Sequence, residues 1–143
     1  MLAVSDPRRR LVSFPALLAG GIAAAVDAGY LVLIRSEGNN EWTDVAPIAL
    51  EIGLAASAAA VAAFLESPAV RVALLTLAAG VLFAWTILGA FSIGVFLAPA
   101  AVLAWLAASH AGYLLRPSVV TASAVSVVVA AFAIVVFQLA VAQ

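Results

Sequence analysis

Apolar residues fill five long stretches of the chain, and short polar segments separate them. A stretch of about 18 or more apolar residues is a candidate transmembrane helix, because about 20 helical residues cross a hydrocarbon core of about 30 Å. We therefore predict an all-α integral membrane bundle of five transmembrane helices in a single domain, residues 1–143. The predicted spans are residues 14–34, 44–65, 68–89, 92–115 and 118–141.

Helix-start signals and glycines separate the spans. Ser67 precedes Pro68 and Arg116 precedes Pro117, and proline is well tolerated in the first turn of a helix. Gly89 lies so few residues before the next apolar run that we expect spans 68–89 and 92–115 to form a tight antiparallel pair.

The arginines predict how the bundle is oriented. Short loops rich in Arg and Lys remain on the cytoplasmic side of a membrane. In a five-span arrangement Arg35 lies on one side, and all other arginines lie on the opposite side: Arg8, Arg9, Arg10, Arg71 and Arg116. We therefore expect the N-terminus inside and the C-terminus outside, with the acidic segment 35–44 as a small outer cap.

The N-terminal segment has a second interpretation. Three arginines followed by an apolar run also resemble a secretory signal, and cleavage of that signal would leave four spans. The apolar run continues to Ile34, which is longer than the usual signal core of about 7 to 15 residues. We therefore favour an uncleaved first span.

Composition excludes several classes of function. Hydrophobic residues make up 67% of the chain and charged residues 9%, which lies far from the composition of soluble proteins. The net charge is -1 and the chain has no lysine, so we expect no nucleic-acid partner. The absence of cysteine excludes disulfides, thiolate metal sites and cysteine catalysis, and we expect no metal and no cofactor.

Two carboxyl groups lie inside predicted spans. Asp27 and Glu51 each fall about 5 Å to the outer side of the membrane midplane, on consecutive antiparallel helices. An acid at the centre of a spanning helix costs about 2.5 to 3.5 kcal/mol on insertion scales, so such a residue is a candidate functional site. One interpretation is a shared-proton pair that binds a proton, a cation or a cationic substrate. The other is that each acid bonds neighbouring polar groups and holds helices together.

His110 is the only histidine, and it lies about 9 Å to the inner side of the centre of span 92–115. At that depth it does not reach the two acids, so a proton relay would require water or hydroxyl groups between them. Haem ligation by two histidines would require a second copy or another chain. The simpler interpretation is a hydrogen bond to a neighbour, or a place near the inner headgroups beside Tyr113.

Small residues recur every four positions in the first span. Gly20, Ala24 and Ala28 form one stripe, and Gly21, Ala25 and Gly29 form the adjacent one. Such stripes allow helices to approach closely, and Asp27 falls on the same broad face, which points it into the bundle. We interpret the tryptophans as packing or interfacial aromatics rather than as a ligand cage: Trp42, Trp85 and Trp105.

Residues 88–101, LGAFSIGVFLAPAA, contain a Gly, Phe-Ser-Ile-Gly, Phe-Leu and Pro-Ala string between two spans. This segment resembles a recurrent segment of small, uncharacterised multi-pass membrane proteins of high-GC Gram-positive bacteria. The resemblance covers about a tenth of the chain. It implies a location in a bacterial plasma membrane, and it implies no activity because the segment carries no catalytic motif.

No phosphate-binding loop, HExxH or GxSxG motif is present, so we expect no enzymatic activity. We predict a helix-packing or accessory subunit whose partners are the lipid bilayer and a homo-oligomer or larger membrane complex. The alternative is a small proton- or cation-coupled carrier or channel that uses Asp27 and Glu51. A third, weaker interpretation is a haem or quinone anchor through His110.

Overall fold

The computed structural model describes residues 7–36, 38, 42–90, 92–113 and 115–141. These residues form five helices: α1 (Pro7–Ser36), α2 (Trp42–Ala62), α3 (Pro68–Leu88), α4 (Gly94–Tyr113) and α5 (Pro117–Val141). Each helix is long and apolar enough to cross a membrane. The predicted all-α class and the five apolar helices are confirmed, and they indicate a multi-pass membrane protein.

Most helix boundaries lie within two residues of the prediction, and two differ by more. Helix α1 begins at Pro7 rather than at residue 14, so it includes the arginine triplet. Arginine is a good helix former, and a helix therefore continues beyond the apolar run that was used to locate it. Helix α2 ends at Ala62 rather than at residue 65, because a tight turn follows in which Phe64 N–H bonds the Val61 carbonyl at 3.0 Å.

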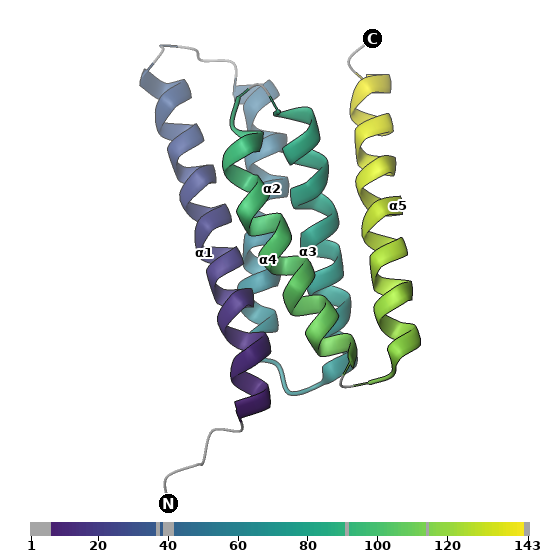
Figure 1. Cartoon of the computed structure of the whole chain (residues 1–143). Coiled ribbons are helices and arrows are strands. Elements are labelled where there is room, and N and C mark those ends of the chain that lie inside the picture. The colour runs from purple at the N-terminus through teal and green to yellow at the C-terminus, as the bar shows by residue number, and fades with distance from the viewer. Residues whose placement is uncertain (1–6, 37, 39–41, 91, 114, 142–143) are drawn as a thin grey trace, which may run out of the picture.

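Successive helices alternate in direction along the bundle (Figure 1). Helix α1 packs against α2 and α4, and α3 packs against α2, α4 and α5. Helix α5 lies at one edge of the bundle, beside α3 and α4 (Figure 1). We name the two ends of the bundle the Pro7 end and the Val141 end, after the helix termini that lie there.

The arginine-bearing segments gather at the Pro7 end. The start of α1, the start of α3 and the connection between α4 and α5 all lie at this end, whereas Ser36 and the end of α3 lie at the other (Figure 1). The asymmetry that was expected from the sequence is therefore present in the bundle. The side of the membrane that each end faces stays a prediction. Part of the predicted cap, residues 37 and 39–41, lies outside the described residues.

The core is rich in alanine, with a few larger side chains such as Leu75 and Leu82, and many large apolar side chains point outward. In α4 the buried positions include a series of alanines at most 1% exposed: Ala100, Ala101, Ala104, Ala107, Ala108 and Ala111. On the outer surface Phe14, Phe64 and Phe132 are 69%, 75% and 70% exposed. In lipid, helices associate through close van der Waals contact and not through the hydrophobic effect, so small residues inside and large ones outside suit a membrane bundle.

The connection between α3 and α4 requires glycine. A Cβ atom on Gly94 would lie 2.5 Å from the carbonyl oxygen of Thr86, which is too close for any side chain. The Gly94 N–H bonds the Gly89 carbonyl at 2.7 Å and closes the turn. The predicted tight pairing of these two spans is confirmed.

Arg71 donates hydrogen bonds to carbonyl groups at the end of α2. This role was not predicted from the sequence. Its side chain is 6% exposed, and its Nε donates to the Ala62 carbonyl at 3.0 Å while Nη2 donates to the Leu65 carbonyl at 2.6 Å. Ser13 of α1 donates to the Ala63 carbonyl at 2.9 Å. The last carbonyl groups of a helix have no hydrogen-bond donor within the helix, so these two side chains supply donors at the end of α2.

Candidate functional site: two carboxyl groups on opposite faces of α2

Asp27 lies on α1 and faces α2. A Cβ atom on Gly53 of α2 would lie 3.4 Å from its Oδ2 atom, so the carboxyl rests against the α2 backbone. Its Oδ1 atom is buried and has no hydrogen-bond partner among the described residues. The expectation that Asp27 points toward the bundle agrees with this position, but the second polar group that would satisfy it is not there.

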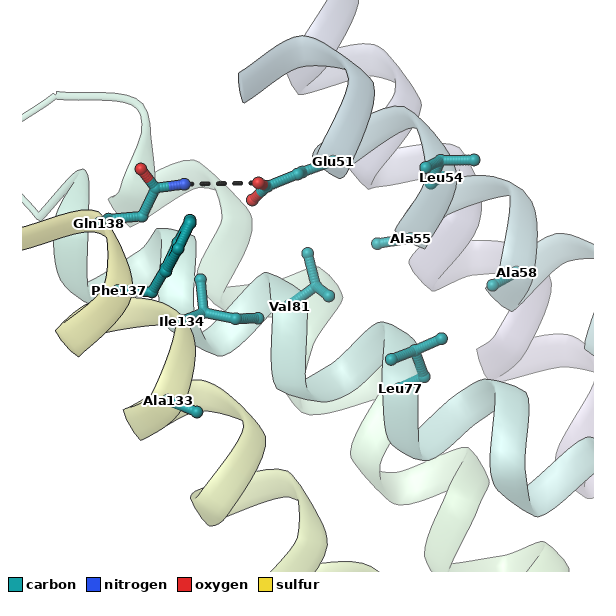
Figure 2. A pocket seen from close by; sticks show the side chains of 10 residues that line it. All are labelled: Glu51, Leu54, Ala55, Ala58, Leu77, Val81, Ala133, Ile134, Phe137 and Gln138. Atoms are coloured by element: carbon teal, nitrogen blue, oxygen red, sulfur yellow. Dashed lines mark hydrogen bonds between the residues drawn. The ribbon is translucent and has the colours of Figure 1, made fainter. Parts of the chain in front are cut away.

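Glu51 is held by two side chains from other helices. Its Oε2 accepts a hydrogen bond from Trp85 Nε1 of α3 at 2.9 Å. Its Oε1 accepts a hydrogen bond from Gln138 Nε2 of α5 at 3.3 Å (Figure 2). Glu51 therefore links three helices.

The two carboxyl groups share a depth but not a side. Asp27 contacts α2 at Gly53, two residues from Glu51 in the sequence, so the two acids lie at similar heights. Two residues correspond to a rotation of about 200° around a helix. Glu51 consequently points toward α3 and α5, whereas Asp27 approaches α2 from the other side. The structure does not bring the two carboxyls together as a pair that shares one proton.

Asp27 lies in the wall of a groove between α1 and α2 with a volume of about 580 Å³. Most of the residues that line it are small: Gly20, Gly21, Ala24, Ala28, Gly53, Ala56, Ser57 and Ala60. Ser57 is the other polar side chain in this lining, and it donates to the Gly53 carbonyl of its own helix at 2.8 Å. The groove thus supplies Asp27 with no hydroxyl donor.

Gly20 differs from the other small residues of the two α1 stripes in its contact with α2. A Cβ atom on Gly20 would lie 2.8 Å from the Ala56 carbonyl oxygen, so this glycine permits the close approach of α1 and α2. Added Cβ atoms on Gly21 and Gly29 would meet nothing within 4 Å. Ala24 and Ala28 are exposed. The close helix contact that the stripes predict is therefore made at Gly20.

A second cavity, of about 400 Å³, lies between α2, α3 and α5, with Glu51 and Gln138 among its lining residues (Figure 2). Trp85 is 7% exposed, in agreement with its interpretation as a packing aromatic. The sequence reading did not identify Trp85 and Gln138 as partners of Glu51. The available signal was that Gln138 is the one side-chain amide in the span 118–141.

His110 lies far along α4, toward the Pro7 end, and its side chain is exposed. Its Nδ1 lies 2.8 Å from the Leu106 carbonyl oxygen of the same helix. This contact fits the simpler interpretation of a histidine that bonds a neighbour. Across the described part of the chain, no group of three His, Asp or Glu side chains is placed to hold a metal ion.

Comparison with protein families, with characterised proteins and with solved structures finds no match to this chain. The resemblance of residues 88–101 to bacterial membrane proteins stays a prediction. The two carboxyl groups and their surroundings are therefore the features that bear on function.

Proposed function

We propose that this protein is a non-enzymatic, helix-packing subunit of a membrane assembly. In this proposal the groove between α1 and α2 binds a transmembrane helix, which belongs to a second copy of the chain or to a larger complex. The single observation that carries the proposal is the buried Oδ1 atom of Asp27, which has no hydrogen-bond partner in a groove of small residues.

Energetics favour a helix as the occupant of the groove. An unsatisfied buried acceptor costs about 1 to 3 kcal/mol, and lipid chains carry no donor that removes this cost. When the Asp27 side chain turns toward the groove, a helix with a Ser, Thr, Asn or Gln side chain at that depth can donate to its carboxyl. Gly21, Ala24 and Ala28 have no side-chain atoms beyond Cβ, so the backbone of that helix can come close to α1.

The test is photo-crosslinking in the native membrane. A photo-reactive amino acid replaces Ala24 in the groove, and the matched control replaces Gly29, which lies on the same helix outside the groove. We expect position 24 to form a defined adduct, either a dimer or one other protein, and position 29 to form none. The adduct should disappear when Gly21→Leu fills the groove. A chain that forms no adduct from position 24 and is strictly monomeric in mild detergent contradicts the proposal.

The location and orientation are part of the proposal. We place the protein in a bacterial plasma membrane, which the resemblance of residues 88–101 supports, with the Pro7 end in the cytoplasm. The gathering of arginine-bearing segments at that end supports this orientation. The natural chain has no cysteine, so single cysteines at Ser5 and Gln143 can be labelled with a membrane-impermeant reagent in intact cells. We expect labelling at position 143 only, and labelling at position 5 contradicts the orientation.

A proton- or cation-coupled carrier or channel is the second candidate. The observation that favours it is the similar depth of Asp27 and Glu51 on adjacent helices. Because their carboxyls point to different sides of α2, each would have to bind its proton or cation separately. This candidate predicts pH-dependent flux in liposomes that Asp27→Asn abolishes. Unchanged flux in that variant contradicts the carboxyl mechanism.

A further inference from the structure

The cavity beside Glu51 exists because α5 stands apart from α2. Helix α5 packs against α3 and α4, and the described contacts between α2 and α5 include the bond from Gln138 to Glu51. Below that bond, α2 and α5 form the two walls, and Leu77 and Val81 of α3 lie between them (Figure 2). The result is a space of about 400 Å³, within the range of about 300 to 1,000 Å³ that is typical of small-molecule sites.

The cavity is polar at one end and apolar along the rest. Of its ten lining residues, Glu51 and Gln138 are polar and the other eight are apolar. Along α2 the lining continues from Glu51 to Ala58, seven residues or about 10 Å closer to the Pro7 end. An occupant would therefore have a polar head toward the Val141 end and an apolar body that extends toward the bundle centre.

Glu51 determines the charge of that head. Its two partners, Trp85 and Gln138, are neutral donors, and each carboxyl oxygen has acceptor capacity for one more bond. The lining contains no Arg, Lys or His. When the carboxyl is ionised, its negative charge in these apolar surroundings has no compensating cation in the lining, and such a charge is stabilised by a cation that approaches it.

We infer that this cavity binds a lipophilic organic monocation, with its positive head at Glu51 and its apolar body against Leu54, Leu77 and Ile134. The carboxyl of Glu51 matches the positive head, the apolar lining matches the body, and the volume is sufficient for a small molecule. The site is separate from the groove at Asp27, because it lies on the opposite face of α2. The inference therefore does not depend on the proposed packing function.

The test measures saturable binding of radiolabelled hexyltrimethylammonium to the full chain in nanodiscs of zwitterionic lipid. Empty nanodiscs correct for partition into lipid. Radiolabelled hexanesulfonate, which has the same apolar chain and an anionic head, is measured in a separate assay and separates charge recognition from simple filling of an apolar space. We expect saturable binding of the cation and no saturable binding of the anion.

Three variants assign the binding to this cavity. Glu51→Gln keeps the size of the side chain and its ability to bond Trp85, and we expect it to weaken the cation by about tenfold or more. Ala58→Phe fills the apolar part of the cavity, and we expect a similar loss although Glu51 is intact. Asp27→Asn removes a carboxyl at similar depth outside the cavity, and we expect unchanged affinity.

Several outcomes would overturn the inference. These are binding that equals that of empty nanodiscs, equal binding of the cation and the anion, and affinity that Glu51→Gln leaves unchanged. A loss of binding in Asp27→Asn equal to that in Glu51→Gln would also overturn it, because the cation would then not be recognised in this cavity. Gel-filtration profiles show whether each of the three variants remains folded, and the Ala58→Phe result tests the site even if Glu51→Gln does not fold.

Discussion

The two faces of α2 are joined to the rest of the bundle in different ways. On one face, α1 approaches so closely that Gly20 has no room for a side chain beside Ala56, and the contact is made by small residues. On the other face, Glu51 spans a wider space through side-chain hydrogen bonds to Trp85 and Gln138. The first face is held by close packing, whereas the second combines packing against α3 with polar bonds to α3 and α5.

This difference explains why two acids at similar depth have different surroundings. Small residues, most of them without side-chain donors, surround Asp27 between α1 and α2, so its carboxyl rests against Gly53 with one oxygen unsatisfied. Helices set further apart leave space that long polar side chains bridge, and both oxygens of Glu51 accept a bond. The α1 face thus leaves one carboxyl oxygen without a hydrogen-bond partner among the described residues, whereas both oxygens of Glu51 join α2 to other helices.

The largest expected effect tests whether packing holds the α1 face. Gly20→Leu would force a side chain against the Ala56 backbone, and we expect the free energy of unfolding to fall by about 1 to 3 kcal/mol or more. Gly21→Leu is the matched control, because a Cβ atom there meets nothing within 4 Å. Titration of the folded chain from mild detergent into dodecyl sulfate, followed by circular dichroism, gives both values. Equal losses in the two variants would show that close packing at Gly20 is not what holds this face.

Replacement of the two acids by leucine should change the free energy of unfolding by less than Gly20→Leu does, and differently for each acid. Glu51→Leu leaves Trp85 and Gln138 without their acceptor, and we expect a loss of about 1 to 2 kcal/mol because interhelical hydrogen bonds in membranes contribute about 0.6 kcal/mol each on average. Asp27→Leu removes an acceptor that is already unsatisfied, so we expect no loss or a gain for the isolated chain. The same dodecyl sulfate titration measures both variants. A loss in Asp27→Leu as large as that in Glu51→Leu would contradict the contrast.

The sequence was sufficient for the elements and for some of their pairings. Five apolar runs of spanning length gave five helices, because in lipid a single segment satisfies its backbone groups only as a helix. The glycines at positions 89 and 94 also predicted the tight pairing of α3 and α4, since a connection that short leaves no other arrangement. These features depend on length and local sequence, which can be read directly.

The sequence was not sufficient for the directions in which side chains point. Each residue turns a helix by about 100°, so the spacing of residues determines which of them share a face but not which neighbouring helix that face meets. Helix α2 is small on almost every side through AASAAA, and no stripe fixes its rotation. The shared depth of Asp27 and Glu51 could therefore be predicted, but their placement on opposite faces could not.

The partners of Glu51 could not be predicted from the order of the helices along the chain, because that order does not say which distant helices meet. Gln138 is 87 residues away in the sequence, and it reaches Glu51 because α5 turns back along α3. Connections of consecutive helices constrain neighbours, but they do not fix which distant helices meet. The one side-chain amide in this span was the local sign that α5 would bond another helix.

The smallest expected effect tests how much of the bridging depends on one bond. Trp85→Phe removes the indole donor to Glu51 while most of the aromatic surface remains, and we expect a loss of about 0.6 kcal/mol from the hydrogen bond itself. Trp105→Phe is the control, because this indole is 38% exposed on the outer surface and makes the same change in ring size. The difference between the two free energies of unfolding isolates the bond from the loss of ring area. If Trp85→Phe and Trp105→Phe lose equal stability, Glu51 is held by Gln138 and by packing, and the polar face of α2 resembles the packed one more than its geometry indicates.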